Sequence, residues 1–226
     1  MKSRMGLIIS LVKRGYDPAQ MLVMLAIRRS LVGCERVLDV GCGKAPTMKL
    51  LGVSHSTGLE GYRPDFEEAR KGGLHEQMVC DDLRNLSRCF APNQFDACIA
   101  LDVIEHLAKD DGLKLMQDME RIAKKRVIFF TPSGFLPQRH AANDDLQAHL
   151  SGWEAKEMKQ HGYKVIGLLG PKGLRGEKHA LKRRPVIFWA VVSLLGQIFW
   201  TRYHPEQAAA IFCVRTVATR KDNAAD

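Results

Sequence analysis

The sequence predicts an α/β fold: a doubly wound, mostly parallel seven-stranded sheet with an N-terminal helical cap and a helical insertion before the last strand. Two observations predict it. Short apolar segments typical of strands alternate with helical segments between residues 34 and 169, and most are connected without hairpin turns, which favours parallel pairing with helices on both faces. The chain has 226 residues, 46% of them apolar, which fits one domain with additions.

Residues 1–33 are predicted to form the helical cap. Asp17-Pro18-Ala19-Gln20 combines an Asp N-cap, a proline in the first turn and a Gln three residues after the cap, which is a strong helix start. Gly33 ends this helix. Before it, the apolar stretch 5–12 is short and is followed by basic residues instead of small ones, so we expect no signal peptide.

Residues 34–169 are expected to form a cofactor-binding core. Strands are predicted at 36–40, 55–60, 77–80, 95–101, 126–131 and 163–169. Helices are predicted at 46–52, at 63–71, from an Asp110 or Asp111 cap to about 122, and at 151–161, where Ser151 and Glu154 form a capping box.

Residues 170–204 are predicted to be an insertion, and 205–226 the last strand with a tail. The insertion has a basic lead followed by the apolar run 186–200, which is shorter than the roughly 20 residues needed to span a bilayer. Cations beside an aromatic-flanked apolar helix suit the face of an anionic membrane. A lid or a homodimer interface is the alternative role for this helix. We therefore expect a cytoplasmic protein, with peripheral membrane contact as one option.

The net charge of +9 is unevenly spread. Residues 1–36 carry +5, residues 37–169 carry −2 and residues 170–204 carry +6. Because the centre is slightly acidic, nucleic acid wrapped over the whole surface is not expected, although a basic edge could still meet phosphates or lipid.

Cysteine and histidine spacing indicates no metal centre. The six cysteines form no C-x-x-C pair and the eight histidines form no H-x-x-x-H pair, so reduced cysteines and no bound metal are expected.

The segment after the first predicted strand carries the strongest signal. Val37-Leu38-Asp39-Val40-Gly41-Cys42-Gly43 ends a strand in two glycines, which allow a tight turn and a close approach to a ligand. Glu60, 17 residues after Gly43, closes the next strand, where a carboxylate can accept hydrogen bonds from a ribose diol. The dinucleotide fingerprint G-x-G-x-x-G fails at Pro46. These residues predict a nucleoside-type cofactor.

At these residues the chain resembles the class I methyltransferases that use S-adenosylmethionine, of the small-molecule and sugar-modifying branch. Their first motif matches Val37 to Gly43, their acidic second motif falls on Glu60, and their third falls on Asp82-Leu83, with Asp81 as the shifted alternative. The fourth runs from Phe95 to Leu107 and ends in Glu-His-Leu. The resemblance covers about residues 34–169.

The resemblance implies a role for each matched residue. Gly41, Cys42 and Gly43 would pass under the methionine part of the cofactor, with Asp39 fixing the loop or binding the amino group. Glu60, followed by Gly61, would hold the ribose hydroxyls. The remaining implied contacts are Asp82 with the adenine amino group, the Leu83 backbone with the adenine ring, and Leu101 with the floor near the sulfonium.

His106 is the best candidate for a catalytic base, because it follows the fourth strand and titrates near neutrality. Packing on the adenosine or capping the next helix is an equally good role for it. Asp102 and Glu105 carry the same ambiguity. His140 and His149 are expected to be solvated loop residues.

The expected acceptor is a small molecule, a sugar or a lipid-linked group. Leu101-Asp102-Val103-Ile104 stands where base-amino methyltransferases carry Asn/Asp-Pro-Pro-aromatic, and no Pro-Cys pair is present. Nucleic acid is therefore expected to be an unlikely partner, with RNA ribose methylation as an alternative. A non-catalytic, cofactor-binding partner protein is another alternative, and a nicotinamide oxidoreductase is a distant third.

Overall fold

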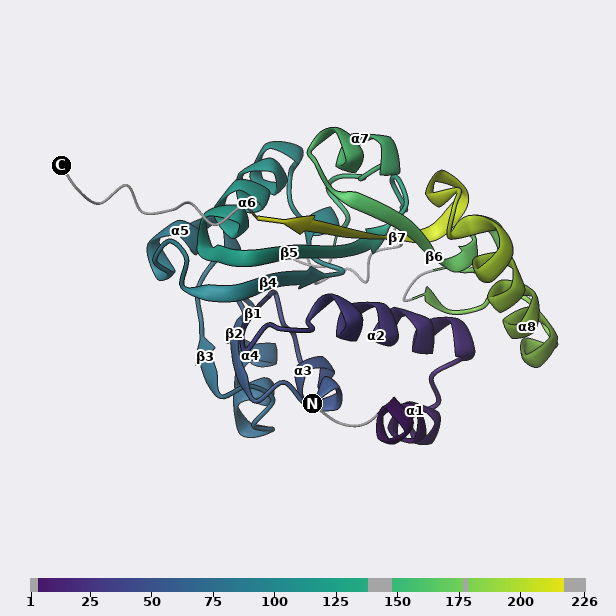
Figure 1. Cartoon of the computed structure of the whole chain (residues 1–226), viewed down its shortest axis with the longest axis horizontal. Helices are drawn as coiled ribbons and strands as arrows, with labels where there is room; N and C mark the ends of the chain where they lie inside the picture. Colours follow the sequence, from purple (N-terminus) through teal and green to yellow (C-terminus); the bar gives the residue numbers. More distant parts are fainter. Residues whose placement is uncertain (1–3, 138–147, 177–178, 218–226) are drawn as a thin grey trace.

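In the computed structural model, a seven-stranded sheet separates two layers of helices (Figure 1). The structure describes residues 4–137, 148–176 and 179–217. The strands are β1 (Arg36–Val40), β2 (His55–Leu59), β3 (Gln77–Val79), β4 (Phe95–Leu101), β5 (Ala123–Pro132), β6 (Lys164–Pro171) and β7 (Ala208–Thr216). The sequence prediction of a doubly wound, mostly parallel seven-stranded sheet is confirmed.

The strand order β3-β2-β1-β4-β5-β7-β6 reverses direction between β1 and β4. The pairs among β1 to β5 are parallel, whereas β7 lies antiparallel between β5 and β6. In doubly wound sheets, ligands bind outside the carboxyl ends of the strands at such a reversal. The topology therefore places a site at the ends of β1 and β4.

Helices cover both faces of the sheet (Figure 1). They are α1 (Arg4–Lys13), α2 (Pro18–Ser30), α3 (Thr47–Leu51), α4 (Arg63–Lys71), α5 (Leu86–Cys89), α6 (Lys109–Ile122), α7 (Ala155–Gln160) and α8 (Val186–Gly196). Short 3-10 turns are η1 (Leu83–Asn85), η2 (Ile104–His106), η4 (Lys172–Leu174) and η7 (Pro205–Gln207), and η6 (Gln197–Thr201) is a π-helix. One apolar core lies under α5, α6 and α7, and a second lies under α1, α2 and α3.

Two predicted helix starts are wrong. The helix expected from Ser151 begins at Ala155, because Trp153 is fully buried and the Ser151 hydroxyl donates to the Ile104 carbonyl instead of capping a helix. The helix after β4 begins at Lys109, with Ala108 in the N-cap position, and the two aspartates expected to cap it lie in its first turn, where their charge still suits the helix dipole.

A buried arginine ties the insertion to the rest of the molecule. The Arg175 side chain, 1% exposed, forms an ion pair at 2.8 Å with Asp17, the N-cap of α2. It also donates to the Leu169 carbonyl at the end of β6 and to the Ser193 hydroxyl of α8. Helix α2, the sheet and helix α8 therefore meet at one side chain.

Candidate functional site

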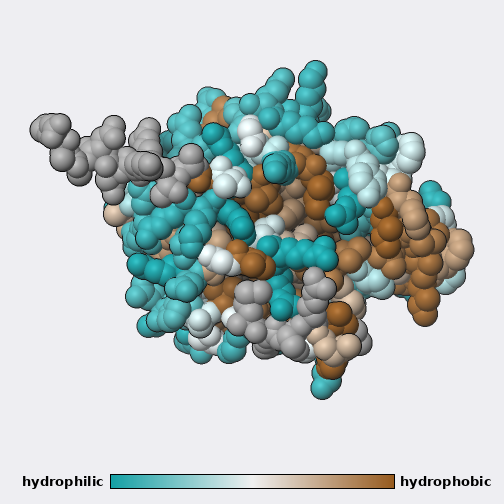
Figure 2. Space-filling view, viewed as in Figure 1, coloured by the Kyte–Doolittle hydropathy of each residue, from teal (hydrophilic) through white to brown (hydrophobic). Residues whose placement is uncertain are grey.

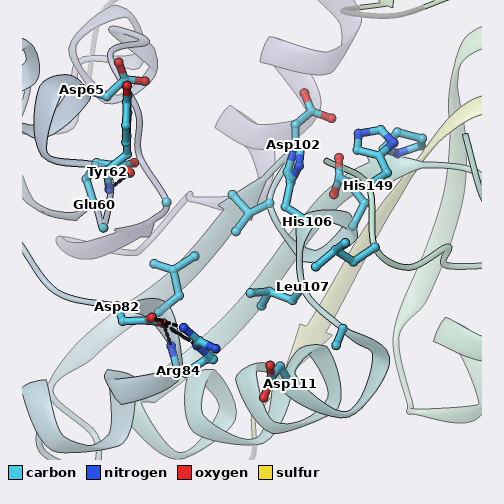
Figure 3. A pocket seen from close by; sticks show the side chains of 18 of the residues that line it. Glu60, Tyr62, Asp65, Asp82, Arg84, Asp102, His106, Leu107, Asp111 and His149 are labelled. Atoms are coloured by element: carbon cyan, nitrogen blue, oxygen red, sulfur yellow. Dashed lines mark hydrogen bonds and ion pairs between the residues drawn. The ribbon is translucent and has the colours of Figure 1, made fainter. Parts of the chain in front are cut away.

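A cavity of about 1030 Å³ opens where the strand order reverses. Figure 3 shows side chains from the β2 end on one side and from the β4 end on the other, with Asp82 and Arg84 below. Residues that line it include Gly41, Glu60, Gly61, Tyr62, Asp81, Asp82, Leu83, Asp102, Val103, Glu105, His106, Leu107, His149, Gly176 and His179.

The loop after β1 packs between the end of β2 and Val103, which follows β4. The backbone N–H groups of Gly41 and Cys42 both donate to the Leu59 carbonyl at the end of β2, at 2.8 and 3.1 Å. Gly41 has φ +64°, and a Cβ there would lie 2.7 Å from a methyl group of Val103. Only glycine fits this position, so the first glycine of the motif is required by the turn itself.

Glu60 connects this loop to the cavity. Its carboxylate accepts hydrogen bonds from the Gly43 N–H and the Tyr62 N–H, both at 2.8 Å. A carboxylate has about four acceptor positions, so two bonds leave capacity for a diol. Gly61, next in the chain, leaves room for the backbone of Asp81, whose carbonyl oxygen would lie 3.2 Å from a Cβ at position 61.

Asp39 lies beneath the loop and does not line the cavity. Its side chain is buried, and one carboxylate oxygen lies 3.7 Å from Nε2 of the buried His75. Burial, with the nearby Glu60 charge, raises the pKa of Asp39 to about 7. The sequence left two roles open for Asp39, fixing the loop or binding the amino group of the cofactor. This placement favours fixing the loop.

Three further residues expected at the cofactor are not among those that line the cavity. Cys42 is buried, and Gly43 contributes through its N–H to Glu60. Leu101 packs against the apolar core that lies under α2. Asp102 and Val103, the next residues in the chain, line the cavity in its place.

Asp81 and Asp82 both line the cavity, and both already have partners. Asp82 caps η1 by accepting from the Arg84 N–H, and the Arg84 guanidinium binds its carboxylate and lowers its pKa. Asp81 accepts from the Asn85 amide and from the Asp82 N–H, which lower its pKa. Leu83 lines the cavity beside them. The third motif therefore presents two ionised carboxylates, and both alternatives for the adenine contact stand.

At the β4 end, the insertion reaches the cavity. Asp102 follows β4 with φ +54°, and its carboxylate lies at hydrogen-bonding distance, 2.9 Å, from Nε2 of His179. The His179 ring also lies 5.2 Å from the ring of Phe130. Sequence reasoning missed His179, because no local pattern connects residue 179 to a strand end 77 positions earlier.

A second group that sequence reasoning missed is a cluster of Glu105, His106 and His149, whose ligand atoms lie within 4.8 Å of one another. The two imidazole rings meet edge to face at 4.8 Å. The backbone N–H groups of Leu150 and Ser151 donate to the Glu105 carbonyl, which brings His149 against the turn after β4. His149, expected in a solvated loop, thus lies beside His106, whereas His140 lies outside the described residues.

The geometry of this cluster suits a cation or a proton. The Nδ1 atoms of His106 and His149 contact the carbonyls of Ala148 and Leu136, at 3.1 and 2.6 Å. Nδ1–H donation to a carbonyl places the ring's lone pair on Nε2. The buried Glu105 accepts from the Thr131 hydroxyl on one oxygen, and its other oxygen has no hydrogen-bond partner among the residues that the structure describes. Burial, with the Asp102 charge, raises its pKa. An oxygen and two imidazole nitrogens are a suitable ligand set for a divalent metal ion.

Residues 38–131 match the family described as "Methyltransferase domain". This range contains the loop after β1, the end of β2 and the turn after β4. Among solved structures, the chain resembles the methyltransferase domain of bacterial CtHen1-CN, with 18% identity, a TM-score of 0.52, and 88% of this chain and 97% of that chain covered. A methyltransferase from Archaeoglobus fulgidus gives a TM-score of 0.50 at 14% identity, with 86% and 93% covered. At 18% and 14% identity, these two structures support only the fold of the chain, whereas the match to the methyltransferase family covers residues 38–131.

Two curated relatives are named for RNA. The "Probable tRNA methyltransferase 9B" of Mus musculus is 36% identical over 87 residues, which are 38% of this chain and 19% of that protein. The "Small RNA 2'-O-methyltransferase" of Tetrahymena thermophila is 23% identical over 201 residues, which cover 73% of this chain and 48% of that protein. The chain thus matches about a fifth to a half of the length of these relatives.

These relatives overturn the expectation that nucleic acid is an unlikely partner. That expectation rested on a slightly acidic centre and on the residues after β4, which argue only against methylation of base amino groups and base carbons. Neither observation bears on a ribose hydroxyl, and neither prevents the basic flanks from meeting phosphates.

Proposed function

We propose that the chain is an S-adenosylmethionine-dependent methyltransferase that methylates a hydroxyl group of RNA, namely a ribose 2'-hydroxyl. The observation that carries the proposal is the cluster of Glu105, His106 and His149 at the β4 end of the cavity. The Tetrahymena relative, which matches 73% of this chain, supports the choice of a ribose hydroxyl, and the murine relative supports RNA.

A hydroxyl acceptor explains why a cluster of this kind lines the same cavity as Glu60, the expected ribose ligand. The sulfonium donor is already activated, so the protein must align the acceptor and exclude water. A hydroxyl must in addition lose its proton during transfer. The cluster supplies one carboxylate oxygen and two imidazole nitrogens for that purpose.

In this proposal Glu105, His106 and His149 would hold a divalent cation, against the expectation of no bound metal, which rested on sequence spacing alone. A divalent cation bound there would lower the pKa of a coordinated hydroxyl. The chain's own contribution is orientation: Thr131 fixes one oxygen of Glu105, and backbone carbonyls fix both imidazole rings. His106, the expected base, would thus act as a ligand that positions the acceptor.

The second acceptor class is the small-molecule, sugar or lipid-linked group. The Glu-His-Leu turn after β4 favours it through the resemblance described above. A methyl-transfer assay with labelled S-adenosylmethionine separates the two classes, with purified RNA, lipid extract and aqueous metabolites offered in parallel.

We expect label in the RNA, and we expect His106→Ala to reduce its incorporation by at least about a hundredfold. His161→Ala is the matched control, because His161 is exposed at the end of α7. Label found only in lipid or in aqueous metabolites would contradict the RNA proposal and leave the methyltransferase activity standing.

A further inference from the structure

Helix α8 and the π-helix η6 that continues it bury polar side chains and expose apolar ones. Ser193, Gln197 and Thr201, spaced four residues apart, are buried against the sheet. The Gln197 side chain accepts from the Leu169 N–H at 2.7 Å, and the Ser193 hydroxyl donates to the Leu169 carbonyl at 2.9 Å. The inward face of this segment is therefore polar.

The outward face is apolar. Its exposed side chains are Ile187, Phe188, Val191, Leu195, Ile198 and Phe199. Ile187 is 82% exposed and Phe199 is 73% exposed. Figure 2 shows a hydrophobic surface over α8, at the right of the molecule.

A helix that faces water normally has the opposite arrangement. In α6, Leu115 and Met119 are buried, and Lys114 pairs with Asp118 on the outside. Exposing a large apolar surface to water while burying hydroxyl and amide groups is unfavourable. The outward face of α8 is therefore matched to an apolar medium.

Positive charge borders this face at both ends. Lys182, Arg183 and Arg184 precede α8, and Arg202 follows η6, and all four are exposed. No acidic residue occurs between positions 178 and 206. The Arg183 guanidinium lies 4.9 Å from the Trp189 ring, which holds a cation beside an aromatic side chain that suits the water–lipid boundary.

We propose that this face, defined by the six apolar residues above and the four flanking cations, docks on the surface of an anionic lipid membrane. No helix among the described residues is long and apolar enough to cross a bilayer, so the segment would lie in the interface plane. Anionic headgroups complement the cations at both ends.

A second copy of the chain fits this face less well. In a two-fold contact, the face meets itself. Both ends of the segment carry only cations, so parallel and antiparallel arrangements would each bring like charges together. The charge distribution thus favours anionic lipid over self-association.

Vesicle flotation tests the proposal. We expect the full chain to float with phosphatidylcholine vesicles that contain phosphatidylglycerol, and to float far less with phosphatidylcholine alone. Arg183→Gln with Arg184→Gln should weaken binding to the anionic vesicles about thirtyfold, at about 1 kcal/mol per charge near the surface. Lys124→Gln is the matched charge control, because Lys124 is exposed on β5.

Ile187→Ser with Phe199→Ser should also weaken vesicle binding at least about tenfold, because both side chains would lose their apolar burial in the lipid. Both residues are mainly solvent-exposed, so folding should be unchanged, as thermal unfolding would verify. Val32→Ser, an exposed apolar site at the end of α2, is the control. Equal binding by wild type and both double variants would overturn the proposal, as would a dimer that Ile187→Ser disrupts. Loss of RNA binding in the arginine variant, with vesicle binding intact, would also overturn it.

Discussion

At the scale of single residues, Glu60 has the most demanding position. Its carboxylate accepts the Gly43 N–H of the loop after β1 and the Tyr62 N–H after the end of β2, and it still faces the cavity. We expect Glu60→Ala to weaken S-adenosylmethionine binding about ten- to a hundredfold, because hydrogen bonds to a charged acceptor are lost. Isothermal titration measures the effect, with Glu67→Ala of α4 as the control, because Glu67 pairs with Arg70 and is not among the residues that line the cavity. Equal affinity in both variants would contradict the role of Glu60.

The raised pKa of Asp39 predicts that the free energy of unfolding depends on pH. Its pKa in the folded protein, about 7, lies above the ordinary value of 3.8. The neutral carboxyl therefore stabilises the fold at low pH, and this contribution is lost as the pH rises through 7. Asp39→Asn stays neutral, so its stability relative to wild type should rise by about 2 kcal/mol between pH 5.5 and pH 8.5. Urea denaturation at the two pH values measures it, and an unchanged difference would contradict the assignment.

The histidine cluster predicts a dependence on divalent metal. We expect chelation by EDTA to reduce methyl transfer at least about tenfold, and added Mg²⁺ or Mn²⁺ to restore it. Binding of S-adenosylmethionine should not change, since Glu60 and the β1 loop are separate from the cluster. Full activity in EDTA, combined with loss of activity in His149→Ala, would contradict the cation and would show that an imidazole accepts the proton instead.

The difference between Glu60 and His149 shows which site residues a sequence reveals. Glu60 closes a strand beside a glycine-rich turn, and both features are local and periodic. His149 reaches His106 only through hydrogen bonds from Leu150 and Ser151 to the Glu105 carbonyl. The sequence does not indicate this contact, because 43 positions separate the two histidines.

At the scale of elements, the pair Asp17–Arg175 connects the N-terminal helix to the insertion. Asp17→Ala removes both the α2 cap and the partner of a buried arginine, and it should lower the free energy of unfolding by about 3–5 kcal/mol. Asp17→Asn keeps a capping side chain and loses the charge, so it should be about 1 kcal/mol less destabilising than Asp17→Ala. Urea denaturation compares the two variants. A wild-type stability for Asp17→Asn would show that the ion pair contributes nothing.

Helix starts were predictable where the local chain decides them. The Asp17–Gln20 capping box forms as expected, because its bonds span three residues and the Arg175 guanidinium binds the same carboxylate without displacing them. The Ser151–Glu154 box has the same spacing, but Trp153 between its members is buried and donates to the Ile104 carbonyl. Tertiary burial overrides the local signal there, and the helix begins later.

At the scale of the whole molecule, the alternation of strands and helices was sufficient to predict the sheet and its parallel character. The placement of β7 between β5 and β6 was not predictable, because strand order depends on tertiary contacts that the local sequence does not encode. The apolar run 186–200 was recognisable, but the sequence could not show that its polar residues face inward. That orientation is set by the unusual Leu169, with φ +65°, whose N–H and carbonyl bind Gln197 and Ser193.

We propose that the methyl group is placed on a ribose hydroxyl of RNA. This proposal is tested most directly by digesting RNA labelled with the purified enzyme to nucleosides and separating them by chromatography. We expect the label to elute with 2'-O-methylnucleosides and His106→Ala to abolish this peak. Label in methylated bases, or label absent from RNA and present in lipid or aqueous metabolites, would contradict it.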